Sequence, residues 1–268
     1  MRSHRLRAAA GNIATGSSAA TTFMPLGVSD MTFELWAKPN GFLTTPFNLY
    51  RKTSSNATRN SFTFLLQFPF LVGIVVYSPE SDSGTSTTFT TGANTFSTGT
   101  WQHLVFTHDT SIGQVKVYNN TTLIETNTDT TNWSSYPNNN SDTYFLTVGK
   151  GDGFTYSGDI SIVRIYKDKA LTASEVTQNY NSEKGRYTTS SSSGTHITNN
   201  LVFHIDAGNT NSYNPNDPNN PNADTEVNSL VGNITNSNYN SNISHSTSDG
   251  GYWTFTSSTG NGIEFDSI

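Results

Sequence analysis

The 268-residue sequence contains no cysteine, which excludes disulfide frameworks, thiolate nucleophiles and zinc sites built from thiolates. Charged residues make up only 13% of the chain, and its polarity comes instead from Ser, Thr, Asn and Gly. The formal net charge is −6. Because contacts to phosphates need clustered Lys and Arg, we do not expect nucleic acid as a partner.

Long apolar runs are lacking as well. The longest spans residues 62–77, is interrupted by polar residues, Pro and Gly, and falls short of the roughly 18 residues of a membrane helix. We therefore expect no membrane insertion. The basic start of the chain, with Arg2, Arg5 and Arg7, is followed by too few apolar residues for a signal peptide. We expect a route of export other than the standard signal peptide, such as assembly into a virion.

Aromatic residues, at 12% of the chain, are numerous enough to fill a core. Thr, Tyr, Phe, Val and Ile favour pleated strands, whereas Asn, Gly, Asp and Pro favour the turns between them. Alternating runs bounded by turn residues predict an all-β protein. The expected strands cover residues 31–39, 47–51, 61–67, 72–77, 88–90, 101–108, 114–118, 122–126, 143–148, 158–166, 201–205, 251–255 and 262–266.

One segment, residues 171–180, has the pattern of a helix. Thr172 is a suitable N-cap, and Glu175 stands three residues later as in a capping box. Composition divides the chain into a basic arm (1–24), a strand-rich module (25–187), a Ser/Thr linker (188–200) and a second group of strands (201–268). In that last group, residues 209–242 are rich in Asn and Pro and predict a long irregular loop.

Several motifs in residues 25–187 resemble laminin-G-like, concanavalin A-like domains, and they occur in the order of that family. They are Met31-Thr-Phe-Glu-Leu-Trp-Ala-Lys-Pro39, Trp101-Gln-His-Leu-Val-Phe-Thr-His-Asp109, Gln114-Val-Lys-Val-Tyr118, Leu146-Thr-Val-Gly-Lys150, Gly158-Asp-Ile-Ser-Ile-Val-Arg-Ile-Tyr166 and the helix of residues 171–180. The resemblance implies a concanavalin A-like (laminin-G-like) antiparallel β-sandwich, a jelly roll with a short helix near residues 172–181.

Residues 201–268 resemble the beginning of such a module, although they follow its end. Strands with open edges and one apolar face are not stable alone, which leaves three arrangements. The strands could fold back onto the first sandwich as a circular permutation, add to the sandwich of a neighbouring subunit, or form a small separate sheet. We favour the first, because it needs no partner.

Aromatic residues in loop-like segments are candidates for a sugar-binding platform. Trp133, Tyr136, Phe154 and Tyr156 lie beside Asn and Asp in such segments, where they could equally be packing elements.

Calcium is the most plausible cofactor, and none is required. In laminin-G relatives calcium lies at the rim of the sandwich, and the resemblance implies Asp109, Asp152 and Asp159 as the nearest acidic residues. An Asp that hydrogen-bonds within its own turn is the competing interpretation. Asp217 and Asp224 in the Asn-rich loop are further candidates.

An enzyme is not expected. The resemblance extends to glucanases, which carry a Glu-x-Asp-x-x-Glu run on one strand, and retaining hydrolysis needs two carboxyls close together. Here Glu264 and Asp266 supply only the first half of that run, and Glu34 has no acidic partner two residues on. His103 is interpreted as a packed structural residue.

The main functional hypothesis is a non-enzymatic virion structural protein, a decoration or adhesion element of a bacteriophage capsid or tail. It is motivated by the absence of cysteine, the absence of a signal peptide and an order of modules that suits assembly. Its partners would be other virion proteins or further copies of the chain, with Arg2, Arg5 and Arg7 docking on an acidic surface unless the arm is simply flexible. Host surface glycans are further candidate partners. The alternatives are a carbohydrate-binding adhesion or filament subunit of a bacterial surface, which would be extracellular, and a glycoside hydrolase, which is disfavoured.

Overall fold

The structure, a computed structural model, describes most of the chain. The described residues are 29–40, 44–52, 58–67, 72–77, 87–90, 96–128, 143–150, 156–240, 242–256 and 262–266. Their strands and helices are β1 (Met31–Pro39), β2 (Thr44–Lys52), β3 (Thr58–Gln67), β4 (Val72–Tyr77), β5 (Thr87–Thr90), β6 (Gln102–Asp109), β7 (Gln114–Asn119), β8 (Thr122–Thr128), β9 (Thr143–Val148), β10 (Gly158–Lys167), α2 (Ala173–Glu183), η2 (Lys184–Arg186), β11 (Leu201–Asp206), β12 (Asn238–Tyr239), β13 (Ser244–Ser246), η3 (Ser248–Gly250), β14 (Tyr252–Phe255) and β15 (Ile263–Asp266).

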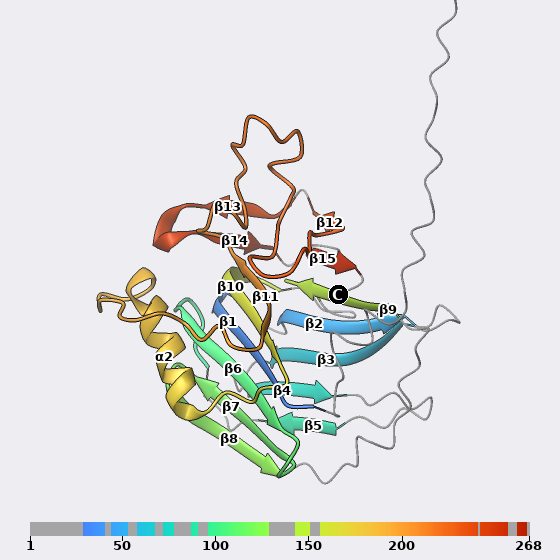
Figure 1. Cartoon of the computed structure of the whole chain (residues 1–268), viewed down its shortest axis with the longest axis vertical. Helices are drawn as coiled ribbons and strands as arrows, with labels where there is room; N and C mark the ends of the chain where they lie inside the picture. The colour runs from blue at the N-terminus through green and yellow to red at the C-terminus, as the bar shows by residue number, and fades with distance from the viewer. Residues whose placement is uncertain are drawn as a thin grey trace, which may run out of the picture.

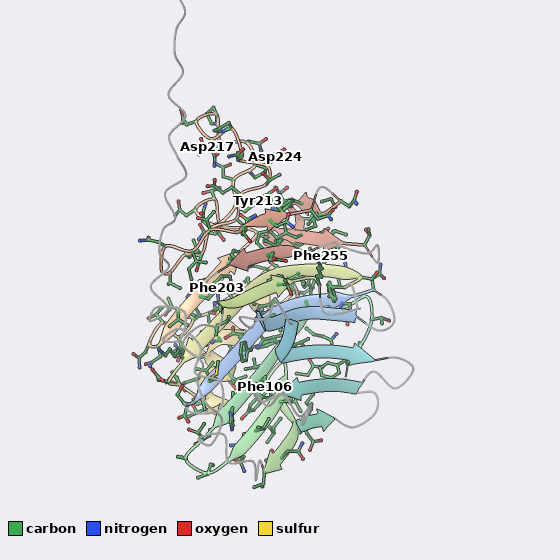
Figure 2. All side chains as sticks on the ribbon, turned by 90° about the vertical axis from the view of Figure 1, so that its right-hand side faces the viewer. Phe106, Phe203, Tyr213, Asp217, Asp224 and Phe255 are labelled. Carbon is green, nitrogen blue, oxygen red and sulfur yellow. The ribbon has the colours of Figure 1, made fainter. Side chains whose placement is uncertain are left out.

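The strands form two antiparallel sheets that pack face to face, as Figure 1 shows. One sheet has the order β13-β14-β10-β1-β6-β7-β8, with β11 also paired to β10, and the other has the order β12-β15-β9-β2-β3-β4-β5. The expected all-β sandwich is confirmed. Aromatic and aliphatic side chains fill the space between the sheets, among them Phe106, Phe203 and Phe255, which are labelled in Figure 2.

The strands after residue 200 join both sheets of this same chain. Strands β11 and β14 pair with β10, and β15 pairs with β9. Their apolar faces enter the common core, where Phe203 packs edge-on against Phe265 with ring centroids 5.0 Å apart. The open edges expected for an isolated group of strands are thereby paired with neighbours in the same sheets.

The side chains of strand β1 alternate between the two faces of its sheet, and both faces are buried. Met31, Phe33 and Leu35 face the other sheet, as the period of two predicts. Helix α2 lies over the opposite face (Figure 1), where Trp36 stacks on Tyr180 of the helix at 5.5 Å.

Helix α2 begins as the sequence predicts. The Thr172 side chain accepts a hydrogen bond from the Glu175 N–H, and the Glu175 carboxylate accepts one from the Thr172 N–H. The capping box is therefore confirmed, and these bonds satisfy N–H groups that the first helical turn leaves without partners. The helix continues to Glu183, beyond the expected end at residue 180.

The Ser/Thr-rich segment after the helix runs back along α2. The Ser193 N–H donates to the Asn181 carbonyl, and the Ile197 N–H donates to the side chain of Asn179. The Gln178 side chain donates to the Thr195 carbonyl. The segment that composition marks as a linker thus carries the chain from the helix to β11 along a defined path.

Candidate functional site

Most of the predicted site residues lie outside the described residues. These are Trp133, Tyr136 and Phe154 of the aromatic group, Asp152 of the calcium group, and Arg2, Arg5 and Arg7 of the basic arm.

Tyr156, the remaining aromatic candidate, is part of the core. Its side chain is fully buried, its ring packs edge-on against Phe255 at 6.1 Å, and its hydroxyl donates to the Asp159 carbonyl at 3.2 Å. Burial, followed by the nearby charge of Asp159, raises the pKa of Tyr156 well above its ordinary value. The expectation of an exposed sugar platform is corrected at this residue, because its side chain is buried and packs against Phe255 of the second group of strands.

The two described calcium candidates lie far apart. On strand β1, Met31 is paired with the residue just before Asp109, and Lys38 is paired with Asp159. The stretch of β1 from Met31 to Lys38 is roughly 23 Å long, so the two Asp residues are separated by about this distance. Asp109 accepts bonds from the Ser111 N–H and hydroxyl, the turn chemistry of the competing interpretation. Asp159 pairs with Lys38 at 3.5 Å and accepts a bond from Thr254 at 2.7 Å. Within the described ranges, no three His, Asp or Glu side chains gather in a way that could hold a metal ion.

A pocket opens elsewhere, between the chain leaving β11 and the turn that joins β13 to β14. Its volume is about 310 Å³. The described residues that line it are Ala207, Gly208, Thr210, Tyr213, Asn214, Pro215, Asn216, His245, Thr247, Gly250 and Gly251. Ligand pockets in proteins start at about this size. The Asn-rich loop above it extends away from the sandwich, with Asp217 and Asp224 toward its tip in Figure 2.

Glycine allows the two walls of this pocket to meet. A β-carbon on Gly208 would overlap the Gly250 carbonyl oxygen, and one on Gly251 would overlap the backbone of Gly208. Gly250 and Gly251 also have φ values of 73° and 100°, in the left-handed region that side chains disfavour. The pocket therefore depends on glycine at three positions, two of which are adjacent in sequence.

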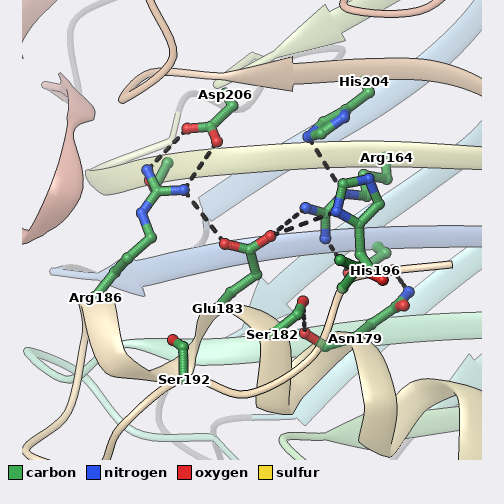
Figure 3. A network of polar contacts seen from close by, with 12 residues as sticks. Arg164, Asn179, Ser182, Glu183, Arg186, Ser192, His196, His204 and Asp206 are labelled. Atoms are coloured by element: carbon green, nitrogen blue, oxygen red, sulfur yellow. Dashed lines mark hydrogen bonds and ion pairs between the residues drawn. The ribbon is translucent and has the colours of Figure 1, made fainter. Parts of the chain in front are cut away.

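Arg186 holds both walls from behind. Its Nη1 and Nη2 atoms donate to the two carboxylate oxygens of Asp206 at 2.9 and 2.8 Å, and Nη2 also donates to the Gly250 carbonyl. Asp206 in turn accepts from the Gly208 N–H at 2.9 Å. A bidentate Arg–carboxylate pair is directional as well as strong, so it fixes the spacing between the walls. Figure 3 shows Arg186, Asp206 and Glu183 side by side.

His245 and Tyr213 form the inner part of the pocket. The His245 Nε2 atom lies 2.9 Å from the Ala207 carbonyl oxygen, and because a carbonyl oxygen only accepts, this ring nitrogen donates the hydrogen bond. The Tyr213 ring lies 4.8 Å from His245 and is nearly buried, while its hydroxyl donates to the Asp224 carbonyl. Tyr213 therefore shapes the wall, and the neighbouring polar groups provide the hydrogen-bonding surface.

Four polar side chains of the lining have no hydrogen bond within the described part of the chain. They are Thr210, Asn214, Asn216 and Thr247. Other Asn residues of the same loop behave differently. Asn209 and Asn220 each accept from the N–H two residues on, and Asn236 accepts from the Val227 N–H. The amides used for folding are thus distinct from those of the Asn residues that line the pocket.

A charge network that is buried except at Glu183 supports the same region from the other side of Arg186. Glu34 on β1 lies opposite Arg164 on β10 and pairs with it at 2.8 Å, and Arg164 also pairs with Glu183 of α2 at 2.6 Å. The His103 Nε2 atom donates to Glu34 at 2.9 Å, and Asn179 donates to its second oxygen. The interpretation of His103 as a packed structural residue is confirmed.

Glu34 does not have the environment of a catalytic acid. Burial alone would raise its pKa, but the charge of Arg164 and the bonds from His103 and Asn179 outweigh burial, and the pKa lies well below its ordinary value of 4.5. A glycosidase acid needs the opposite shift. The network instead ties α2 to the sheet.

The pocket is a feature that sequence reasoning missed. The visible signals were the density of Asn in residues 209–242 and the pair Gly250-Gly251. Neither signal indicates that the two segments meet. No helix among the described residues is long and apolar enough to cross a membrane.

Several solved structures are distantly similar to this chain. The CBM40 of the Ruminococcus gnavus IT-sialidase, bound to alpha2,3 sialyllactose, is 14% identical with a TM-score of 0.45, covering 56% of this chain and 81% of its own. The SAP-like pentraxin of Limulus polyphemus is 18% identical with a TM-score of 0.41, covering 57% and 70%. The NanB sialidase of Streptococcus pneumoniae is 17% identical with a TM-score of 0.46, covering 60% and 25%. Structures as distantly similar as these do not indicate the function of this chain.

No curated protein matches the chain significantly in sequence. A family model does match, that of the concanavalin A-like lectin/glucanases superfamily, over residues 11–177. The match covers more than half of the chain and ends inside α2, so the second group of strands lies beyond it. The chain belongs to the concanavalin A-like lectin/glucanases superfamily.

Proposed function

We propose that the chain is a non-enzymatic carbohydrate-binding module and that the pocket between residues 207–216 and 245–251 binds the glycan. The observation that carries the proposal is the set of polar side chains in the pocket that the fold itself does not use. Membership in a superfamily of lectins and glucanases supports the same class of ligand.

The chemistry of the lining suits sugar hydroxyls. Each hydroxyl of a sugar both donates and accepts, and the amides of Asn214 and Asn216 and the hydroxyls of Thr210 and Thr247 do the same. Because Arg186 and Asp206 brace the walls, these groups are positioned before a ligand arrives, which lowers the entropy that binding costs.

A glycan array tests the proposal with three proteins. The unmodified chain should bind a defined subset of glycans, and the double variant Asn214→Ala/Asn216→Ala should bind them at least about tenfold more weakly, because it loses at least two hydrogen bonds. Asn219→Ala is the matched control: Asn219 is exposed on the same loop and does not line the pocket. Equal binding by all three proteins would contradict the assignment of the site.

The location of the module, on a virion or on a bacterial surface, stays a prediction from the sequence. On a virion surface, as on a bacterial surface, it would serve adhesion to glycans. Particles assembled with the double variant should retain the protein but attach less to glycan-bearing cells. Loss of the protein from the particles would point instead to a role of the loop in assembly.

A further inference from the structure

The charged groups around the pocket are either paired with an opposite charge or negative, and the buried Nε atom of Arg186 has no hydrogen-bond partner among the described residues. No Asp, Glu, Lys or Arg side chain is among the described residues that line it. Among the described residues, Arg186 is the cation that lies against its walls, and it is paired with Asp206 at 2.8 Å and with Glu183 at 3.5 Å. Asp249, next to Gly250 in the wall, is exposed and accepts a bond from the Trp101 side chain.

The sequence extends this charge pattern beyond the pocket itself. After Arg186 the chain contains no Lys or Arg, while it contains seven acidic residues, which are Asp206, Asp217, Asp224, Glu226, Asp249, Glu264 and Asp266. Both walls of the pocket come from this stretch. An anionic ligand would thus meet a negative surface without a cation to pair with, and desolvating an unpaired carboxylate is costly.

The hydrogen-bonding groups of the pocket also favour an uncharged ligand. Carboxylates and phosphates accept hydrogen bonds only, and proteins bind them with Arg, Lys or rows of N–H groups. In this pocket the Gly208 N–H is already used by Asp206, and the Gly251 N–H is used by the Ser248 carbonyl. What remains is a mixture of donors and acceptors from the amides and hydroxyls of the lining residues. Such a mixture matches hydroxyl groups and acetamido groups.

We infer that the pocket accepts one uncharged sugar residue and rejects acidic sugars such as sialic and uronic acids. The inference rests on the proposed function and specifies its ligand. The volume of about 310 Å³ suits a single ring, because it lies at the lower end of ligand-binding pockets.

The test titrates the full chain with two sets of methyl glycosides by NMR saturation transfer and calorimetry. The uncharged set contains glucose, galactose, mannose and N-acetylglucosamine, and the acidic set contains glucuronic acid and N-acetylneuraminic acid. At least one uncharged glycoside should bind, and its affinity should change less than about twofold between roughly 0.05 and 0.5 M salt, because no ion pair is formed. The Asn214→Ala/Asn216→Ala variant should weaken it about tenfold.

A charge variant sharpens the comparison. Asn216 is exposed at the pocket rim, so Asn216→Lys adds a cation there without disturbing the core. This variant should gain binding of the acidic glycosides, and added salt should remove that gain. The matched control Asn219→Lys places the same charge on the same loop outside the pocket and should not gain it.

The outcomes separate the inference from the proposed function. Binding of an acidic glycoside to the unmodified chain, lost in the double variant, would overturn the inference and leave the carbohydrate-binding function standing. Binding that the double variant retains, or no binding by any glycoside, would overturn the assignment of the pocket and the inference with it.

Discussion

Gly208 and Gly250 touch backbone to backbone, so that a β-carbon on Gly208 would overlap the carbonyl oxygen of Gly250. The two residues are separated by 41 residues, which contain a long loop, the short strands β12 and β13 and the start of η3. Their contact closes one side of the pocket, and the hydrogen bonds of Arg186 and Asp206 lie directly behind it.

The variant Gly208→Ala should therefore lose glycan binding. The added methyl group forces the two walls apart and should lower the free energy of unfolding by about 1–3 kcal/mol, as overpacking does. Urea unfolding and the glycan array measure the two effects. Gly194→Ala is the control, because its β-carbon would meet no atom within 4 Å and only its φ of 77° is unfavourable. If Gly208→Ala bound glycans as well as Gly194→Ala does, the contact would not shape the site.

Glu34 should be important for stability. In Glu34→Gln the buried Arg164 loses a charged partner, and removing one partner of a buried pair costs about 3 kcal/mol or more. The urea midpoint should fall accordingly. Glu125→Gln, on the edge strand β8, should change stability by less than about 0.5 kcal/mol. Equal effects of the two substitutions would show that the buried charge contributes little.

Stability should decrease as the pH falls below about 6.5. Burial, followed by the charge of Arg164, lowers the pKa of His204 from 6.5 to about 2, so the folded state keeps this residue neutral while the unfolded state takes up a proton. The unfolded state then binds more protons, and stability falls by up to about 1.4 kcal/mol per pH unit for one such group. Glu34, whose pKa is lowered, adds a loss in the same direction below its ordinary value of 4.5.

Urea unfolding between about pH 7 and about pH 5 measures this slope. His204→Gln should flatten it, since the unfolded state then has one fewer group to protonate. His196, whose pKa is also lowered by burial, should keep part of the slope. A slope unchanged by His204→Gln would assign the pH dependence to other groups.

Removal of residues 200–268 should prevent the rest of the chain from folding. Those residues place Phe203, Trp253 and Phe265, all fully buried, in the shared core. Each such side chain contributes about 1.5–3 kcal/mol, and their sum rivals the whole stability of an ordinary domain. Circular dichroism and hydrogen exchange should show an unfolded or aggregated product. A folded, monomeric 1–199 fragment would show that residues 25–187 are stable without these strands.

Local patterns were sufficient to predict most of the strands. The expected bounds of residues 72–77 and 143–148 match β4 and β9, because alternation and flanking turns are properties of a few consecutive residues. The short strands β12 and β13 were not predicted. Their sequences, Asn238-Tyr239 and Ser244-His245-Ser246, have no apolar alternation, and their pairing with β15 and β14 holds them in place.

The sequence by itself determined the class of the fold and the start of the helix, since period-two alternation and the Thr172–Glu175 cap act over a few residues. Only the tertiary structure decided where the strands after residue 200 go, which face of β1 the helix covers, and which Asn side chains remain available to a ligand. These depend on contacts between distant residues, such as Gly208 with Gly250 and Glu34 with Arg164. No local pattern encodes such contacts, because their energy exists only once both segments are in place.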